Sequence, residues 1–277
     1  MLKKLLKQEW KSFSAAPTIT MIILTAVTLI LMGTFMTSFW DQDNIFVNLF
    51  ASLTILAYIF SLAALSFCVM LCTAVRFYKN LFTDEGYLMF TLPVKTSDLL
   101  LSKALVAILW RLISDVFIIL SIMGIATVGI SYLSDTSIIQ FFEEFSDIFR
   151  ELFSSMQESL TVPIPLFFLW LLLIGIGSLV SGTLFIYTCI CLGQFWSRHK
   201  IGGAIIAYFG LRFILRILRQ IFSLPLSSLY SSYYNMEEIT AGTWLLVMFV
   251  TLLILAGVCA ALYCTCNYIM SRKLNLD

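Results

Sequence analysis

Few residues in this chain could do chemistry, and their spacing argues against catalysis. His199 is the only histidine, and no His-Glu-x-x-His string occurs. The acidic doublets Asp84-Glu85, Glu143-Glu144 and Glu237-Glu238 all lie outside the long apolar stretches. An intramembrane metalloprotease would need such groups together on a helix. We therefore predict no catalytic residue in this chain and no metal bound by it.

The cysteines predict packing rather than chemistry. They are Cys68, Cys72, Cys189, Cys191, Cys259, Cys264 and Cys266, and all lie inside apolar runs. Metal ligands converge from loops or helix faces in polar company, which is missing here. Small, polarizable side chains between packed helices are the expected role. We predict no disulfide framework.

A second set of charged residues lies inside the apolar stretches. Each such charge costs about 3 kcal/mol near the bilayer centre. Asp115 follows Lys103 by 12 residues and Arg212 follows Lys200 by 12, so both lie about 18 Å deep at 1.5 Å per residue. We predict that Asp115 and Arg212 form a structural ion pair, which Arg111 could share. A role of this network in gating or substrate contact is the alternative.

Three arginines share one face of the fifth apolar stretch. Arg212, Arg216 and Arg219 follow one another at i, i+4 and i+7. Such a face would line a cavity, meet acidic groups or reach the outer headgroups, as Arg219 could by snorkelling. Facing a shared cavity, it would favour an anionic or amphipathic substrate.

The elements that carry these residues follow from composition. Of the 277 residues, 60% are hydrophobic and 12% are charged, and the mean hydropathy is +0.97. Soluble domains have roughly 45–50% apolar and about 25% charged residues, so most of this chain must lie in lipid. We predict an all-α membrane protein of one domain, residues 1–277, without a cleavable signal peptide. Its six transmembrane helices span about 18–39, 46–75, 104–133, 166–195, 201–222 and 243–268.

Lysine and arginine set the predicted orientation. With both ends in the cytoplasm, the cytoplasmic segments hold 12 of these residues and the outer loops hold only Arg150. Cytoplasmic loops of membrane proteins carry this excess of positive charge. We predict a multi-pass protein of the bacterial cell membrane with both termini inside.

Two amphipathic helices are predicted outside the spans. In residues 2–15, apolar residues alternate with four lysines at helical spacing, as in a helix at the membrane interface. A simple basic anchor is the alternative. In residues 136–160, phenylalanines alternate with acidic residues at helical spacing. This outer helix would lie on the outer leaflet or cap a dimer, with or without contact to substrate.

The segment 76–103 is predicted to be a cytoplasmic loop. Pro93 would stop a helix, Thr96 or Ser97 would cap the next one, and Asp98 would lie in its first turn. An apolar patch in the cytoplasm would be exposed unless something covers it, and such patches mark protein interfaces. The apolar residues are Phe82, Tyr87, Leu88, Phe90 and Leu92. Cover by the protein's own helices is the alternative.

This loop carries a resemblance to a known family. The strings Thr83-Asp84-Glu85-Gly86-Tyr87-Leu88, Thr91-Leu92-Pro93-Val94 and Leu101-Ser102-Lys103 resemble the first cytoplasmic loop of type-2 ABC transporter permeases of Gram-positive bacteria. The resemblance implies that Asp84, Glu85, Gly86, Tyr87 and Leu88 form a helix that docks, beside Phe82, into a separate ATPase. Leu92 and Pro93 would turn the chain back to the membrane.

The same resemblance implies the function and partners. The chain would be the membrane subunit of an ATP-driven exporter, paired with itself or with a related permease, and without nucleic-acid partners. No Gly-x-x-x-x-Gly-Lys-Ser/Thr string occurs, so ATP and Mg would bind in the partner ATPase and no cofactor in this chain. The outer helix departs from the family pattern, where a short loop joins spans three and four.

An ion- or proton-coupled carrier or channel is the alternative function. It would use Asp115 and the arginines of the fifth span. Such carriers are often built from inverted repeats with broken helices, and no such repeat is evident.

Overall fold

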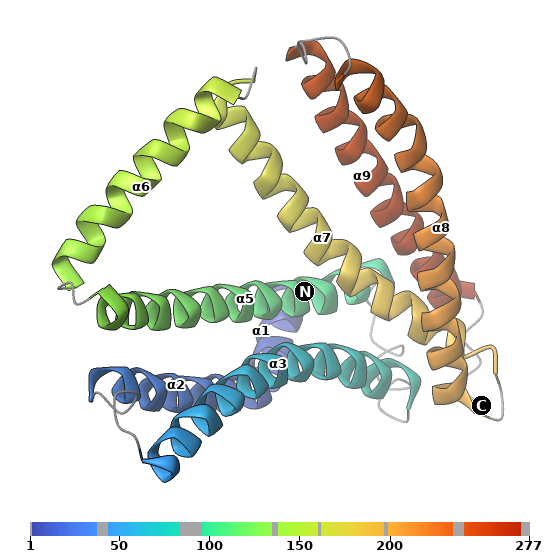
Figure 1. Cartoon of the computed structure of the whole chain (residues 1–277). Coiled ribbons are helices and arrows are strands. Elements are labelled where there is room, and N and C mark those ends of the chain that lie inside the picture. The colour runs from blue at the N-terminus through green and yellow to red at the C-terminus, as the bar shows by residue number, and fades with distance from the viewer. Residues whose placement is uncertain are drawn as a thin grey trace. The chain divides into compact units, whose positions relative to one another are not determined.

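The structure of the chain is a computed structural model. It describes residues 2–37, 44–83, 96–134, 138–159, 162–196, 199–234 and 241–272. These residues form helices, with no strand among them (Figure 1). The helices are α1 (Leu2–Phe13), α2 (Ala15–Met36), α3 (Ile45–Phe82), α5 (Thr96–Ser134), α6 (Ile138–Ser159), α7 (Ile164–Gly193), α8 (Lys200–Tyr234) and α9 (Ala241–Arg272).

Six of the described helices are long and apolar enough to cross a membrane. They cover Ala15–Met36, Ile45–Phe82, Thr96–Tyr132, Ile164–Gly193, Lys200–Ile221 and Ala241–Ser271. Each exceeds the roughly 20 residues that a bilayer core requires. The predicted class, an all-α membrane protein, is confirmed, and the six candidate helices overlap the six predicted spans.

Both ends of segment 76–103, which was predicted to be a loop, are helical. Helix α3 continues to Phe82, seven residues beyond the predicted end of the second span, and α5 already begins at Thr96. Asp98 lies in the first turn of α5, as predicted. The predicted ends of spans two and three were the ends of the apolar runs. A helix requires only unbroken backbone hydrogen bonds, so it can continue beyond the apolar residues.

The chain divides into two compact units. Unit 1 comprises Met1–Arg76 and Leu105–Leu152, and unit 2 comprises Phe77–Ala104 and Phe153–Asp277. The division therefore falls within α3, α5 and α6. How the units assemble into one membrane domain stays a prediction.

Unit 1 is built on α2, α3 and α5, which run alongside one another (Figure 1). Its core consists of Leu24, Leu31, Tyr58, Leu65 and Val69. These residues recur at spacings of seven and four, which places them on one face of α2 and one face of α3. Side chains of α5 pack against this cluster from a third direction.

Helix α1 packs against the same unit. The chain bends at Ser14, and Pro17 lies in the first turn of α2, where its missing N–H costs nothing. Phe13 is 5% exposed and stacks on Trp110 of α5 at 6.2 Å between ring centroids. The guanidinium of Arg76 lies 5.9 Å from the Phe13 ring and donates to Ser12 Oγ. Part of the apolar face of α1 is thus occupied by protein.

Unit 2 is built on α7, which contacts both α8 and α9. A Cβ atom added to Gly193 would lie 2.6 Å from the backbone nitrogen of Ala204, so α7 and α8 approach closely there. Trp170 Nε1 donates to the carbonyl of Met248 and to Thr251 Oγ1, which ties α7 to α9. Small residues and satisfied polar groups of this kind hold membrane helices together.

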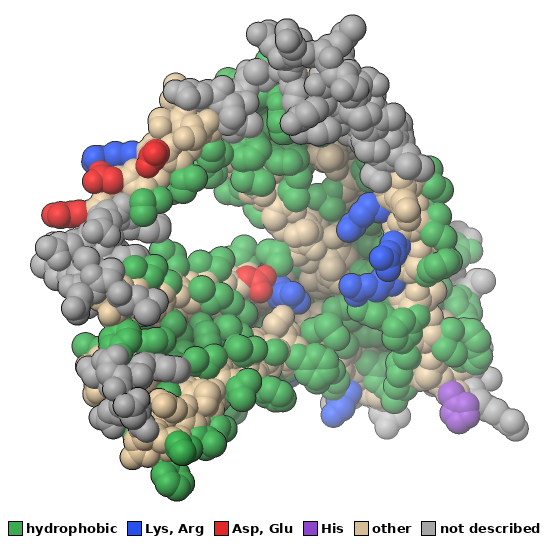
Figure 2. All heavy atoms as spheres, viewed as in Figure 1, with side chains coloured by type: hydrophobic (Ala, Val, Ile, Leu, Met, Phe, Trp, Pro, Cys, Tyr) green, Lys and Arg blue, Asp and Glu red, His purple; other side chains and the backbone are tan. Residues whose placement is uncertain are grey.

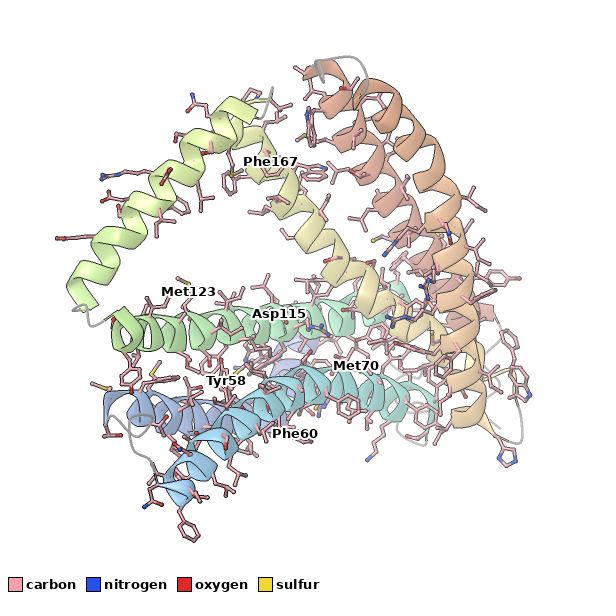
Figure 3. The ribbon with its side chains drawn as sticks, in the orientation of Figure 1. Tyr58, Phe60, Met70, Asp115, Met123 and Phe167 are labelled. Carbon is pink, nitrogen blue, oxygen red and sulfur yellow. The ribbon has the colours of Figure 1, made fainter. Side chains whose placement is uncertain are left out.

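The outward faces of the spans are apolar (Figure 2). In each candidate span, at most 22% of the residues of an apolar 18-residue stretch are buried inside the protein. Phe46 of α3 is 83% exposed and Phe60 is 78% exposed (Figure 3 labels Phe60). Surfaces like these are stable only against lipid or another apolar surface.

Candidate functional site

The two helix ends that flank the predicted coupling loop are both held firmly in unit 2. At the end of α3, the ring of Phe77 stacks on Tyr187 of α7 at 3.8 Å and 10° between planes, and Leu81 is completely buried. At the start of α5, Leu100 and Ser102 are completely buried. The end of α3 is therefore in direct contact with α7.

Phe82 differs from its predicted exposure. It is only 9% exposed, and its ring lies edge-on to Phe77 at 5.9 Å and stacks on Tyr78 at 6.3 Å between ring centroids. Cover by the protein's own chain was the alternative to exposure in the sequence analysis. The remaining predicted coupling residues, Asp84, Glu85, Gly86, Tyr87, Leu88, Leu92 and Pro93, lie outside the described residues.

Asp115 has a cationic neighbour on its own helix. Arg111 Nε lies 3.4 Å from Asp115 Oδ1, one turn apart on α5 (Figure 3 labels Asp115). The two side chains are 37% and 39% exposed. Opposite charges one turn apart stabilise each other, so this pair is close to neutral as a whole. The predicted pair of Asp115 with Arg212 joins residues of different units and stays a prediction.

The arginines of α8 are exposed along one face. Arg212 donates to Tyr208 Oη, and its guanidinium carbon lies 5.6 Å from the centroid of the Tyr208 ring. Tyr208 is itself fixed edge-on against Phe185 of α7 at 5.3 Å. Arg216 and Arg219 are exposed on the next two turns. Basic side chains gather along α8 in the space-filling view (Figure 2).

No acid within the spans of unit 2 balances these arginines. The sequences of Ile164–Gly193, Lys200–Ile221 and Ala241–Ser271 contain neither Asp nor Glu. The spacing of the arginines was visible in the sequence. The contact between Tyr208 and Arg212 was not predicted from the sequence. It could have been, because a tyrosine four residues before an arginine lies on the same helix face.

The structure also brings together polar groups that sequence reasoning did not connect. In unit 1, Ser121 Oγ of α5 lies 2.9 Å from Thr28 Oγ1 of α2 and 3.1 Å from Tyr58 Oη of α3. In unit 2, the sulfur atoms of Cys191 and Cys266 lie 3.3 Å apart between α7 and α9. Partners so far apart in sequence leave no local pattern that could have indicated these contacts.

The cysteines are all free thiols. In the part of the chain that the structure describes, no group of three or more His, Cys, Asp and Glu side chains could hold a metal ion. The described residues thus present a row of exposed arginines on α8 and two buried helix ends, those of α3 and α5, on either side of residues 84–95.

Comparison with known proteins gives no relative. No protein-family model, no curated protein and no solved structure matches the chain.

Proposed function

We propose that this chain is the membrane subunit of an ATP-driven ABC exporter of the bacterial cell membrane. A separate ATPase would dock on the segment around residues 84–93, and ATP and Mg would bind there and not in this chain. Both termini would lie in the cytoplasm, as the distribution of Lys and Arg favours. Six apolar helices of suitable length are consistent with such a subunit.

The burial of the two helix ends on either side of residues 84–95 is the observation that carries the proposal. An ATPase can move a membrane subunit only if its docking segment is attached to helices that are firmly packed in that subunit. Phe77 and Leu81 on one side and Leu100 on the other are buried against the same unit. Movement of the intervening segment would therefore be passed to α7 through the stacked rings of Phe77 and Tyr187.

The exposed arginines support assembly as a dimer. Arg212, Arg216 and Arg219 lie within a membrane span, and each would cost about 3 kcal/mol if it faced lipid near the bilayer centre. In a dimer, with itself or with a related permease, this face would line an enclosed path instead.

The test starts with the neighbouring genes, where the proposal expects an ATPase, and continues with reconstitution of that ATPase with this chain. Purified together in nanodiscs, the two chains are expected to form a stable complex with stimulated ATP hydrolysis. Glu85→Lys should abolish both, because it reverses charge in the proposed docking segment. Glu143→Lys on α6 is the matched control and should change neither, since it lies at the opposite predicted surface.

Two results would contradict the proposal. One is a full complex with the Glu85→Lys variant, and the other is the absence of any effect of this chain on ATP hydrolysis. Substrate movement that needs an ion gradient but no ATP, and that fails in Asp115→Asn, would instead support the carrier or channel.

A further inference from the structure

Among the described residues, three arginines of the spans have no carboxylate bound to them. Arg111 and Asp115 cancel on α5, within 3.4 Å of each other. Apart from Asp98 in the first turn of α5, Asp115 is the only acid in the sequences of the six candidate spans, and Arg212, Arg216 and Arg219 remain. Because a bare arginine is costly in a bilayer, an anion or water must meet this face when the protein is in the membrane.

The arginines are spaced along the depth of the membrane. They lie 12, 16 and 19 residues beyond Lys200, or about 18, 24 and 28 Å along the helix at 1.5 Å per residue. With a hydrocarbon core about 30 Å thick, they run from near the middle of the bilayer towards the outer surface. The outermost, Arg219, could reach the headgroups, but Arg212 could not.

Arg212 is held in position while the other two arginines are not. The Tyr208 ring and hydroxyl fix its guanidinium, and Phe185 fixes Tyr208 in turn. A guanidinium has five N–H donors, so one bond to Tyr208 leaves most of them available to an anion. A planar guanidinium binds phosphate or carboxylate oxygens in pairs.

The same face of α8 is apolar on its cytoplasmic half. Ile205 lies two turns before Arg212 and is 54% exposed, and Phe209 lies one turn before it and is 67% exposed. Ile201, a further turn back, is 65% exposed. One helix face thus offers about two turns of apolar contact followed by two turns of positive charge. That order suits a molecule with a hydrocarbon chain and an anionic head.

We propose that the α8 face formed by Ile205, Phe209, Arg212, Arg216 and Arg219 binds an amphipathic anion, its phosphate or carboxylate head on the arginines and its chain along the apolar half. The role of this face as a transport path rests on the proposed function, and the arginines would then lead the head from the middle of the membrane to the outer surface. Binding itself does not depend on the ATPase.

The experiment measures binding to the purified full chain in neutral detergent by native mass spectrometry. Dodecyl phosphate is the probe, with dodecyltrimethylammonium and inorganic phosphate as comparisons. We expect dodecyl phosphate to bind, the cationic amphiphile not to bind, and inorganic phosphate to bind at least about tenfold more weakly, because it lacks the apolar contact. The triple variant Arg212→Gln, Arg216→Gln and Arg219→Gln should bind dodecyl phosphate about tenfold more weakly, or weaker still.

Two controls separate binding from folding. The triple lysine variant at the same positions keeps the charge and should retain most of the affinity, and Arg150→Gln on α6 should leave it unchanged. Unaltered affinity in the triple glutamine variant, or equal binding of the cationic amphiphile, overturns the proposal. Binding of inorganic phosphate as tight as dodecyl phosphate overturns the amphipathic assignment. None of these results depends on whether an ATPase associates with the chain.

Discussion

Ser121 connects three helices of unit 1 through hydroxyl groups. Thr28 donates its single proton to the carbonyl of Leu24 at 2.6 Å. A hydroxyl has one proton to give, so Ser121 must donate to Thr28, and Tyr58 must donate to Ser121. The result is a directed chain from Tyr58 on α3 through Ser121 on α5 to the backbone of α2. Figure 3 labels Tyr58 at one end of this chain.

Removal of the middle hydroxyl should cost more than removal of an end. Ser121→Ala breaks two hydrogen bonds between helices, and Tyr58→Phe breaks one. At about 0.6 kcal/mol for each bond in a membrane protein, we expect losses of roughly 1.2 and 0.6 kcal/mol in unfolding free energy. Thermal unfolding in detergent measures both.

Thr25→Val is the matched control for these hydroxyls. Thr25 is exposed and donates only to the carbonyl of Met21 on its own helix. Its replacement should therefore leave the contact between helices intact. A loss in Thr25→Val as large as that in Ser121→Ala would show that the hydroxyl chain does not stabilise unit 1.

At the scale of elements, the glycines of α7 differ in what surrounds them. Gly193 faces the backbone of Ala204, and Gly177 faces the flexible side chain of Leu255. Gly175 and Gly182 have nothing within 4 Å of an added Cβ. Only the structure separates the glycines that are closely packed from those with free space around them.

Alanine substitutions should follow this difference. Gly193→Ala would place its Cβ 2.6–2.8 Å from Ala204, so α7 and α8 must move apart, at a cost of about 1–3 kcal/mol. Gly177→Ala should cost less, because the Leu255 side chain can turn away. Gly182→Ala should be neutral or slightly stabilising, since alanine favours a helix. Equal melting temperatures for the Gly193 and Gly182 variants would contradict the close crossing of α7 and α8.

Helix α6 should lie along the membrane surface. Its 22 residues make a rod about 33 Å long. Three residues join it to α5 and four join it to α7, a reach on the order of 15 Å, so neither end can rise far from the membrane. Ile148, Phe149 and Leu152 are each more than half exposed, whereas Glu143 and Asp147 are exposed on the opposite face.

Photo-crosslinking distinguishes lipid contact from dimer contact. Benzoylphenylalanine in place of Phe149 should yield lipid adducts in nanodiscs, because this side chain would point into the bilayer. The same residue in place of Asp147 is the matched control and should yield none. Crosslinks from position 149 to a second copy of the chain, without lipid adducts, would show that α6 caps a dimer instead.

At the scale of the whole molecule, the distribution of charge predicts the topology. A fluorescent protein fused after Asp277 should be bright, because it folds in the cytoplasm. Alkaline phosphatase inserted between α5 and α6 should be active, because that connection is predicted to lie outside. The positive-inside bias is the physical reason, with 12 basic residues inside and Arg150 outside. The reverse pattern of the two reporters would overturn the orientation.

The sequence by itself determined the class of this protein, an all-α membrane protein with six long apolar helices. Lipid offers no partner for backbone N–H and C=O groups, so each apolar run of sufficient length must become a helix. The runs around Thr18 to Phe39 and Thr243 to Tyr268 were therefore enough to place α2 and α9. Helical spacing alone also placed α1 and α6 and aligned the arginines of α8.

Only the tertiary structure decided which faces of these helices are occupied by protein. In a span that is apolar all round, no periodicity distinguishes the packed side from the side that faces lipid. The stacking of Phe77 on Tyr187, the hydroxyl chain through Ser121 and the contact of Cys191 with Cys266 all depend on partners distant in sequence. The free energy of such contacts arises when the helices pack, so no local pattern could have predicted them.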